Sequence, residues 1–136
     1  MNIALEDAEV GAQVAERNFD PVGREQLQAY AQASGDLNPL HLDPAFARKA
    51  GFDDVIVHGM LGMALLGRLL EEDLGHYRLL AFSTRFTGVV KVGQTLRCRA
   101  LLSGRAEGTA TLSLEAIDGE GRAVINGSAQ VALDRP

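Results

Sequence analysis

From Gly59 to Leu70 the chain carries an apolar or small side chain at every position except Arg68. A helix that is apolar on nearly all sides is usually buried over most of its circumference. The three glycines in this stretch, at 59, 62 and 67, would each cost roughly 1 kcal/mol relative to alanine, so we expect something to pack close to the helix backbone. The stretch is shorter than the roughly 20 apolar residues that cross a membrane. The sequence therefore predicts a core built around one buried helix.

After Gly75, which we expect to end this helix, apolar residues recur at every second position. Such alternation is typical of half-buried β-strands, and four runs show it: 80–86, 96–102, 111–116 and 125–133. Asp118–Gly121 predicts a tight hairpin, and Ser103–Gly108 gives a weaker turn signal. Since sequential strands joined by short turns run antiparallel, the chain is expected to have an α+β fold with an antiparallel sheet wrapped on the helix.

The first part of the chain reads as a short strand followed by helices. Val14–Phe19 fits the strand, and Asp20-Pro21 predicts the start of a helix. A second short helix is expected between Asp43, as its cap, and Gly51, as its terminator. The loop Ser34–Pro39 separates the two helices. Because no repeat or linker is present, residues 1–136 are expected to form a single domain.

Charge and cysteine content exclude some functions. The chain has 136 residues, 13 of them basic and 18 acidic, so its net charge is 13 − 18 = −5. This acidic balance argues against a general nucleic-acid binder or a binder of anionic membranes. The single cysteine, Cys98, cannot form an internal disulfide, and the amino-terminal residues lack the pattern of a secretory signal. We therefore expect a cytoplasmic protein.

The loop between the first two predicted helices holds Asp36, Asn38 and His41 within six residues. Histidine can act as an acid or a base near neutral pH, whereas an aspartate needs burial or a partner to do so. A turn at Gly35 and Pro39 can point both side chains into one cleft. Aspartate and asparagine are also ordinary loop residues, so the residues alone leave a catalytic and a structural role open.

His58-Gly59 stands where the buried helix is expected to begin. The first turn of a helix has unpaired amide N–H groups and a positive partial charge. A glycine there lets a substrate carbonyl reach an amide, which is the geometry of an oxyanion hole. A packed histidine beside a permissive glycine explains the pair as well, so both readings stay open at this point.

Some of the same residues could bind a metal ion. Asp36, His41, Asp43 and His58 are potential ligands, but Asp43 is better explained as a helix cap. No cysteine joins the group and the spacing matches no recognised zinc motif. The sequence therefore predicts neither a metal nor another cofactor.

Taken together, these segments resemble the MaoC-like (R)-specific enoyl-CoA hydratase family. The resemblance is carried by Tyr30–Pro44 (YAQASGDLNPLHLDP), Gly51-Phe52 and Val57–Met60 (VHGM), and downstream by Arg85–Val90 and Val92–Leu96. The chain departs from the family pattern at Val55 and Val89, where proline is frequent, and at Gly67, where some members carry a hydroxyl residue.

The resemblance implies a hot-dog fold and a homodimer or dimer of dimers with active sites near the subunit interface. It implies a hydro-lyase that adds water to trans-2-enoyl-CoA and forms (R)-3-hydroxyacyl-CoA. Asp36 and His41 would be the catalytic dyad, and the Gly59 amide would stabilise charge on the thioester carbonyl. Asn38 would orient the dyad or its water, and His58 would belong to the substrate-binding site.

Two other functions are compatible with these residues. One is the same chemistry on acyl carrier protein, as a 3-hydroxyacyl-[acyl carrier protein] dehydratase of fatty-acid synthesis. The other is a non-catalytic hot-dog protein that binds acyl thioesters. Hot-dog thioesterases rank lower, because they lack the pairing of Asp36 with a histidine five residues later.

Overall fold

The computed structural model describes residues 4–133. Its elements, in chain order, are β1 (Gln13–Phe19), α1 (Arg24–Ser34), the 3-10 turn η1 (Pro39–His41), α2 (Pro44–Lys49), α3 (Gly59–Leu74), β2 (Arg78–Phe86), β3 (Leu96–Ala106), β4 (Thr109–Ile117) and β5 (Ala123–Ala132). The strands form one antiparallel sheet in the order β1-β3-β4-β5-β2. The α+β fold expected from the sequence is confirmed.

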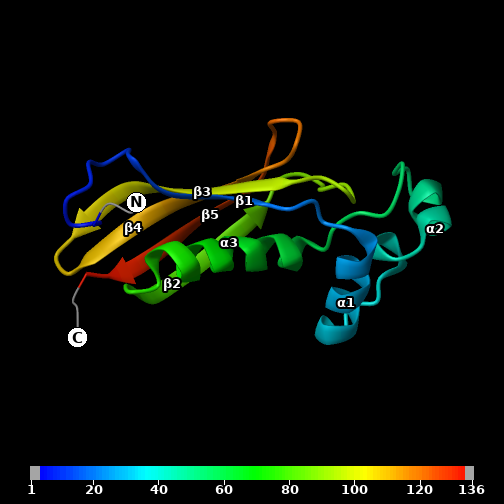
Figure 1. Cartoon of the computed structure of the whole chain (residues 1–136), viewed down its shortest axis with the longest axis horizontal. Coiled ribbons are helices and arrows are strands. Elements are labelled where there is room, and N and C mark those ends of the chain that lie inside the picture. The colour runs from blue at the N-terminus through cyan, green and yellow to red at the C-terminus, as the bar shows by residue number, and fades with distance from the viewer. Residues whose placement is uncertain (1–3, 134–136) are drawn as a thin grey trace.

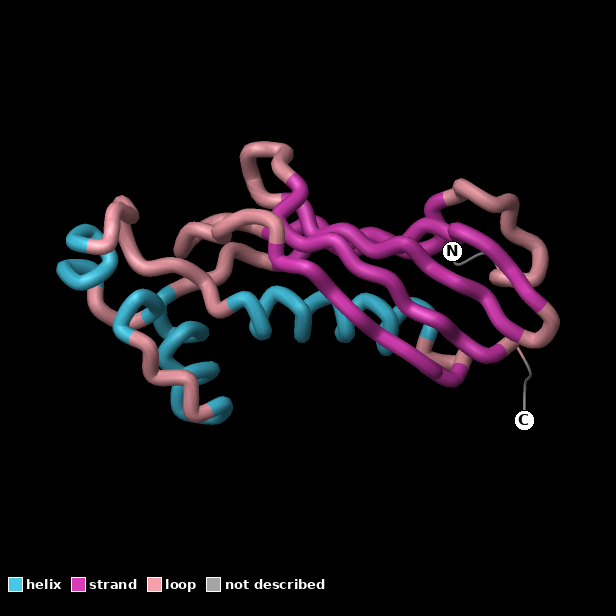
Figure 2. Tube along the Cα trace, turned by 180° about the vertical axis from the view of Figure 1, so that it is seen from behind, coloured by secondary structure: helices cyan, strands magenta, loops and turns pink. Residues whose placement is uncertain are grey.

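Helix α3 lies along one face of the sheet, as Figure 1 shows, and its leucines form the centre of the core. Alternate residues of β3 and β4 point into the same core, which explains their strict two-residue periodicity. The shorter α1 and α2 do not cover the sheet. Both views place them beyond the amino-terminal end of α3 (Figures 1 and 2). The loop that joins α1 to α2 is therefore held next to the start of α3.

The close approach expected at the α3 glycines is present. A Cβ atom at Gly62 would lie 2.5 Å from Cδ1 of Ile125, and one at Gly59 would lie 3.3 Å from the ring of Phe86. Side chains of β5 and β2 thus occupy the space that larger helix residues would need. This packing explains how the helix offsets the propensity cost of glycine.

The burial expected around α3 and in the first alternating run is only partly present. Seven α3 residues are buried, but Met60 is 55% exposed. Strand β2 lies at a sheet edge, and Leu79, Leu80 and Phe86 are each nearly half exposed. The expectation of a half-buried strand is wrong for β2 in the single chain, because α3 packs mainly on β1, β3 and β4 and leaves most of β2 uncovered.

The first helix begins later than the sequence predicted. Asp20-Pro21 does not start it; α1 begins at Arg24 with Gly23 as its cap. The intervening Val22 is 1% exposed. Its N–H donates to the carbonyl of Gln94, and its own carbonyl accepts from the N–H of Gly93. Burial and these two long-range hydrogen bonds keep the chain extended past the proline.

The other helix and turn predictions hold, with one adjustment. Asp43 caps α2 by accepting from the N–H groups of the two residues after Pro44, and Gly75 follows the last residue of α3. The buried Asp118 carboxylate accepts from the amides of Glu120 and Arg122 in the predicted hairpin. The turn expected over Ser103–Gly108 is shorter than the sequence predicted, because β3 continues to Ala106.

Cys98 is fully buried in β3, and burial raises the pKa of its thiol to about 12. The cytoplasmic location expected from this lone cysteine stays a prediction. No helix within residues 4–133 has both the length and the apolar character to cross a membrane.

Gly127 provides a test of the sheet edge. A Cβ atom there would lie 2.5 Å from the main-chain oxygen of Ser83 in β2. Gly127→Ala must therefore push β2 away from β5, and we expect it to lower the free energy of unfolding by about 1–3 kcal/mol. Denaturant titration measures this change. Gly104→Ala in β3, which meets nothing within 4 Å, is the control and should change stability by less than about 0.5 kcal/mol. Equal stability of the two variants would contradict the packing described.

Candidate active site

The loop that carries Asp36 starts with a left-handed residue. Gly35 ends α1 with a φ of 79°, and its N–H donates to the carbonyl of Ala31. Glycine adopts this conformation at little cost. Asp36 Oδ1 then accepts from the N–H of Asn38, and Asn38 Oδ1 accepts from the N–H of Leu40. These two side-chain turns hold the loop in shape and show that the Asn38 side chain is engaged within it.

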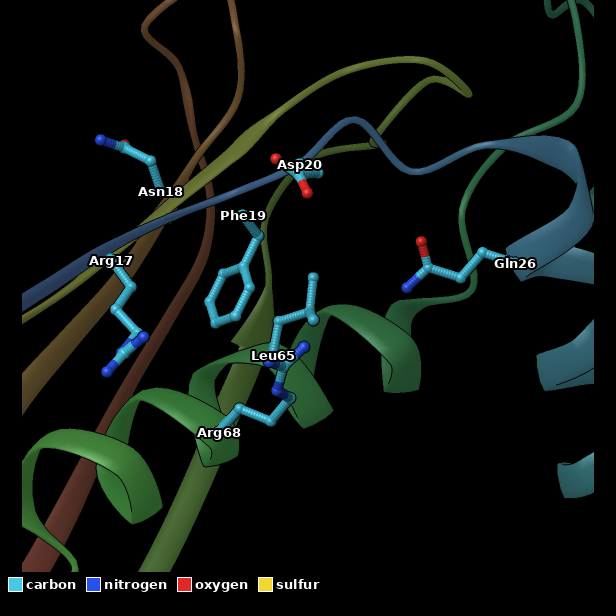
Figure 3. A pocket seen from close by; sticks show the side chains of 7 residues that line it. All are labelled: Arg17, Asn18, Phe19, Asp20, Gln26, Leu65 and Arg68. Carbon is cyan, nitrogen blue, oxygen red and sulfur yellow. The ribbon is translucent and has the colours of Figure 1, made fainter.

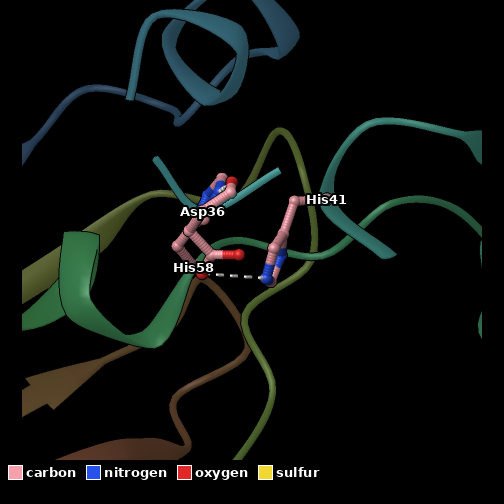
Figure 4. A group of neighbouring side chains, drawn as sticks. All are labelled: Asp36, His41 and His58. Atoms are coloured by element: carbon pink, nitrogen blue, oxygen red, sulfur yellow. Dashed lines mark hydrogen bonds and ion pairs between the residues drawn. The ribbon is translucent and has the colours of Figure 1, made fainter. Parts of the chain in front are cut away.

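His41 has a defined tautomer when it is neutral. Its Nδ1 lies 2.8 Å from the main-chain oxygen of Ile56. A carbonyl oxygen can only accept, so Nδ1 carries the hydrogen and Nε2 carries the lone pair. That Nε2 faces Asp36 Oδ2 at 4.0 Å (Figure 4). The separation is too long for a direct hydrogen bond and is suited to a bridging water.

His58 lies directly before α3 and is only 1% exposed. Its Nε2 lies 3.2 Å from the main-chain oxygen of Asp36. Its ring stacks on that of His41, with centroids 3.8 Å apart and planes at 24°. Burial lowers the pKa of His58, an effect that the hydrogen bond to the Asp36 carbonyl opposes. His58 is therefore a neutral imidazole that donates from Nε2.

Gly59 is the first residue of α3, a helix of 16 residues. The main-chain oxygen of His58 accepts from the N–H groups of Leu61 and Gly62. The N–H groups of Gly59 and Met60 precede these bonds, at the positively polarised end of the helix. An apolar cavity of about 180 Å³ adjoins them, lined among others by His41, Gly59, Gly62, Phe86, Val89 and Ile125. The arrangement thus combines titratable groups, helix amides and an apolar recess.

His41 also lines a second cavity. This cavity, of about 280 Å³, is lined by Arg24, Gln28, His41, Leu42, Pro44 and Val55. The carboxylate of Asp54 pairs with Arg24 at 2.9 Å, and this contact lowers the pKa of Asp54 to about 2. The His41 side chain therefore lines both an apolar recess and a more polar cavity.

A larger cavity of about 430 Å³ lies away from the dyad, between β1, α1 and α3 (Figure 3). Its two arginines are already paired. Arg17 contacts Glu72 and Asp73 at 3.0 and 2.8 Å. Arg68 contacts Glu72 and lies over the ring of Phe19. We assign no chemistry to this cavity.

Three potential metal ligands do come together. One ligand atom from each of Asp36, His41 and His58 lies within 4.8 Å of the others. The two imidazoles are stacked, however, so their lone pairs lie in two nearly parallel planes, which disfavours binding of one ion by both rings. The fourth candidate, Asp43, caps α2 instead. The expectation that the site needs no metal stays a prediction.

The structure therefore gathers Asp36, Asn38, His41, His58 and Gly59 in one place. The sequence analysis missed two groups that shape this place. The Ile56 carbonyl fixes the His41 tautomer, and a main-chain atom leaves no sequence signal. Phe86 was placed on a strand by its alternation, but that pattern says nothing about its packing over Gly59.

Comparisons with known proteins show the family of the chain. The family model described as "MaoC like domain" matches residues 6–120. The solved (R)-hydratase of Aeromonas caviae is 34% identical to this chain and superposes on it with a TM-score of 0.85. The superposition covers 95% of this chain and 99% of the hydratase.

Two curated relatives match parts of the chain. The (R)-specific enoyl-CoA hydratase of Aeromonas caviae is 50% identical over 52 residues, which is 38% of this chain. The mitochondrial 3-hydroxyacyl-[acyl-carrier-protein] dehydratase of Arabidopsis thaliana is 42% identical over 76 residues, which is 56% of this chain. The aligned segments span 39% of the length of each of these relatives.

The family model covers most of the chain, and the solved (R)-hydratase is matched over almost its whole length. The chain therefore belongs to the MaoC-like domain family and has the hot-dog fold that its sequence led us to expect.

Proposed function

We propose that this chain is a hydro-lyase that adds water to trans-2-enoyl-CoA, forming (R)-3-hydroxyacyl-CoA, and that catalyses the reverse dehydration. One observation carries the proposal: Asp36 Oδ2 and His41 Nε2 face each other 4.0 Å apart beside the first turn of α3. Relatives named as an (R)-hydratase and an (R)-specific enoyl-CoA hydratase support the choice of reaction.

The dyad suits a water molecule of fixed orientation. The Asp36 carboxylate accepts hydrogen bonds, and so does the bare Nε2 of neutral His41. A water between them donates both of its hydrogens, one to each group. Its oxygen lone pairs are then free to face C3 of the enoyl group. Positioning of this kind supplies a large part of the rate in reactions between bound partners.

The proton can pass through His41. As the water oxygen bonds to C3, His41 Nε2 takes one water proton and later delivers it to C2. Negative charge develops meanwhile on the thioester oxygen, where the Gly59 amide and the dipole of α3 stabilise it. The net change is addition of OH to C3 and H to C2, with the dyad returned to its starting state. Asn38 holds the loop that carries Asp36.

The apolar recess beside Gly59 is the proposed site for the acyl group. Phe86, Val89 and Ile125 line it, and none of these side chains can hydrogen-bond to the substrate. An apolar site excludes competing water and strengthens the electrostatic effect of the helix amides.

Acyl carrier protein is the alternative thioester carrier. The Arabidopsis thaliana relative carries the name of a 3-hydroxyacyl-[acyl-carrier-protein] dehydratase, and the chemistry at C2 and C3 is the same for both carriers. Comparing kcat/KM for crotonyl-CoA and crotonyl-acyl carrier protein decides between them. A non-catalytic binder of acyl thioesters would hold either ligand without turnover.

The roles of Asp36 and His41 can be tested with crotonyl-CoA as the substrate. Incubation with crotonyl-CoA should consume the conjugated-thioester absorbance, and chiral analysis should find the (R)-3-hydroxy product. Asp36→Asn and His41→Ala should each lower kcat at least about 100-fold, because the first removes the negative charge of the carboxylate and the second removes the nitrogen that takes the water proton. Asp53→Asn and His76→Ala, both at exposed positions, are matched controls that should retain activity. An (S) product, or full activity in both dyad variants, would refute the assignment.

Two substitutions of Gly59 test whether its amide N–H stabilises the thioester oxygen. Proline is well tolerated as the first residue of a helix, and His58, with φ −58° and ψ 131°, already has a conformation that precedes proline. Gly59→Pro therefore removes the N–H while the helix start persists. Gly59→Ala brings a Cβ against Phe86 as well but keeps the N–H. The initial-rate assay should show the proline variant about 100-fold or more slower than the alanine variant. Equal rates in the two would exclude the amide as the oxyanion donor.

We also propose that the chain acts as a homodimer joined through β2. This edge strand exposes Leu79, Leu80 and Phe86, and Met60 of α3 is exposed as well. An unpaired apolar edge favours pairing with another strand, and a second copy related by a twofold axis presents the same edge. Such an interface would cover the open face of α3 and close the recess beside Phe86.

Light scattering coupled to size exclusion checks the dimer. The wild-type particle should have about twice the chain mass of 14.5 kDa. Leu80→Lys places a charge in the proposed interface and should shift the particle towards the monomer. Val10→Lys alters a residue that is 62% exposed and lies outside β2, so it should leave the mass unchanged. A monomeric wild-type particle would contradict the interface.

A further inference from the structure

His58 connects the three parts of the candidate site. Its Nε2 lies 3.2 Å from the main-chain oxygen of Asp36. One face of its ring stacks on His41 at 3.8 Å, and the ring of Tyr30 approaches at 4.8 Å with a tilt of 60°. The next residue is Gly59, at the start of α3. Any displacement of His58 would therefore disturb the carboxylate loop, the imidazole of His41 and the helix amides together.

The chemistry of His58 is unusual for a residue that only fills space. It is 1% exposed, and its Nδ1 is buried without a hydrogen-bond partner among the described residues. A buried polar atom without a partner lowers stability. A phenylalanine would fill similar space without that cost, but it would lose the hydrogen bond to Asp36. The ring nitrogen that matters is therefore Nε2.

His58 also lines the apolar recess beside Gly59, but its donor nitrogen is already engaged. Its Nε2–H is committed to a main-chain carbonyl, and one ring face is covered by His41. His41 is in turn held at Nδ1 by the Ile56 carbonyl. With one ring edge and one ring face fixed, His41 can present only Nε2 to Asp36.

We propose that His58 is a positioning residue: its Nε2–H anchors the main chain of Asp36, and its ring sets the plane of His41. This role rests on the proposed hydration reaction, in which the dyad must hold one water in a fixed orientation. A misplacement of about 1 Å at such a site is enough to cost roughly 100-fold in rate.

Two variants separate the anchor from the stacked ring. His58→Gln keeps an amide donor near the position of Nε2 and loses the ring. His58→Phe keeps the ring and loses the donor, and it also removes the unpartnered Nδ1. We expect kcat for crotonyl-CoA to fall by about 10- to 100-fold in each, with KM within about twofold of the wild-type value. The denaturation midpoint of the phenylalanine variant should stay close to the wild-type value although its kcat falls. His76→Gln, at an exposed position, is the matched control and should keep the wild-type kcat.

Nitrogen-15 NMR of the imidazoles gives a readout that a space-filling role would not change. In the wild-type protein the Nδ1–H of His41 should give a sharp signal, protected by the Ile56 carbonyl. We expect this signal to broaden in His58→Gln, which loses the stacked ring, and to stay sharp in His58→Phe, which keeps it, while the backbone amide spectrum stays dispersed. A sharp His41 signal in His58→Gln, or wild-type kcat in either variant, would overturn the proposal. If the wild-type protein hydrates no enoyl thioester, the reaction is wrong, and the NMR comparison still decides whether His58 positions His41.

Discussion

Burial of the leucine-rich face of α3 against the sheet is the interaction on which the other features depend. Leu61, Leu65, Leu66 and Leu69 are buried there, and full burial of each contributes roughly 1.5–3 kcal/mol. Because this contact extends along the helix, the amino-terminal end of α3 cannot move independently of the sheet. Gly59 and His58 are therefore held at a fixed place, and the loop with Asp36 and His41 is built against them.

The proposed catalytic side chains lie on irregular backbone, which gains its rigidity from contacts with this fixed place. The left-handed Gly35 sets the direction of the loop. The Ile56 carbonyl holds His41, and His58 holds the main chain of Asp36. Hydrogen bonds in an apolar surrounding are stronger than in water. A short loop can thus present an acceptor pair with defined geometry although it lacks regular secondary structure.

The exposed apolar surface of the single chain follows from the same architecture. Residues 59–70 of α3 have apolar or small side chains on nearly all sides of the helix, yet one sheet covers only one of its faces. Met60 and the edge strand β2 remain exposed beside the recess at Phe86. A second copy provides the missing cover in the proposed dimer, so completion of the apolar recess and association of the chains would be one event.

Local patterns in the sequence determined the element types, the strand alternation, the Asp43 cap and the hairpin at Asp118, because each depends on residues within a few positions. Resemblance in the short segments around Asp36, His41 and Gly59 pointed to the family and to the candidate site. Only the tertiary structure decided the delayed start of α1, which long-range hydrogen bonds at Val22 impose. It also decided the pairing of β2 with β5 and the stacking of His58 under His41. These features join residues far apart in the chain, and their geometry follows from packing that no local pattern encodes.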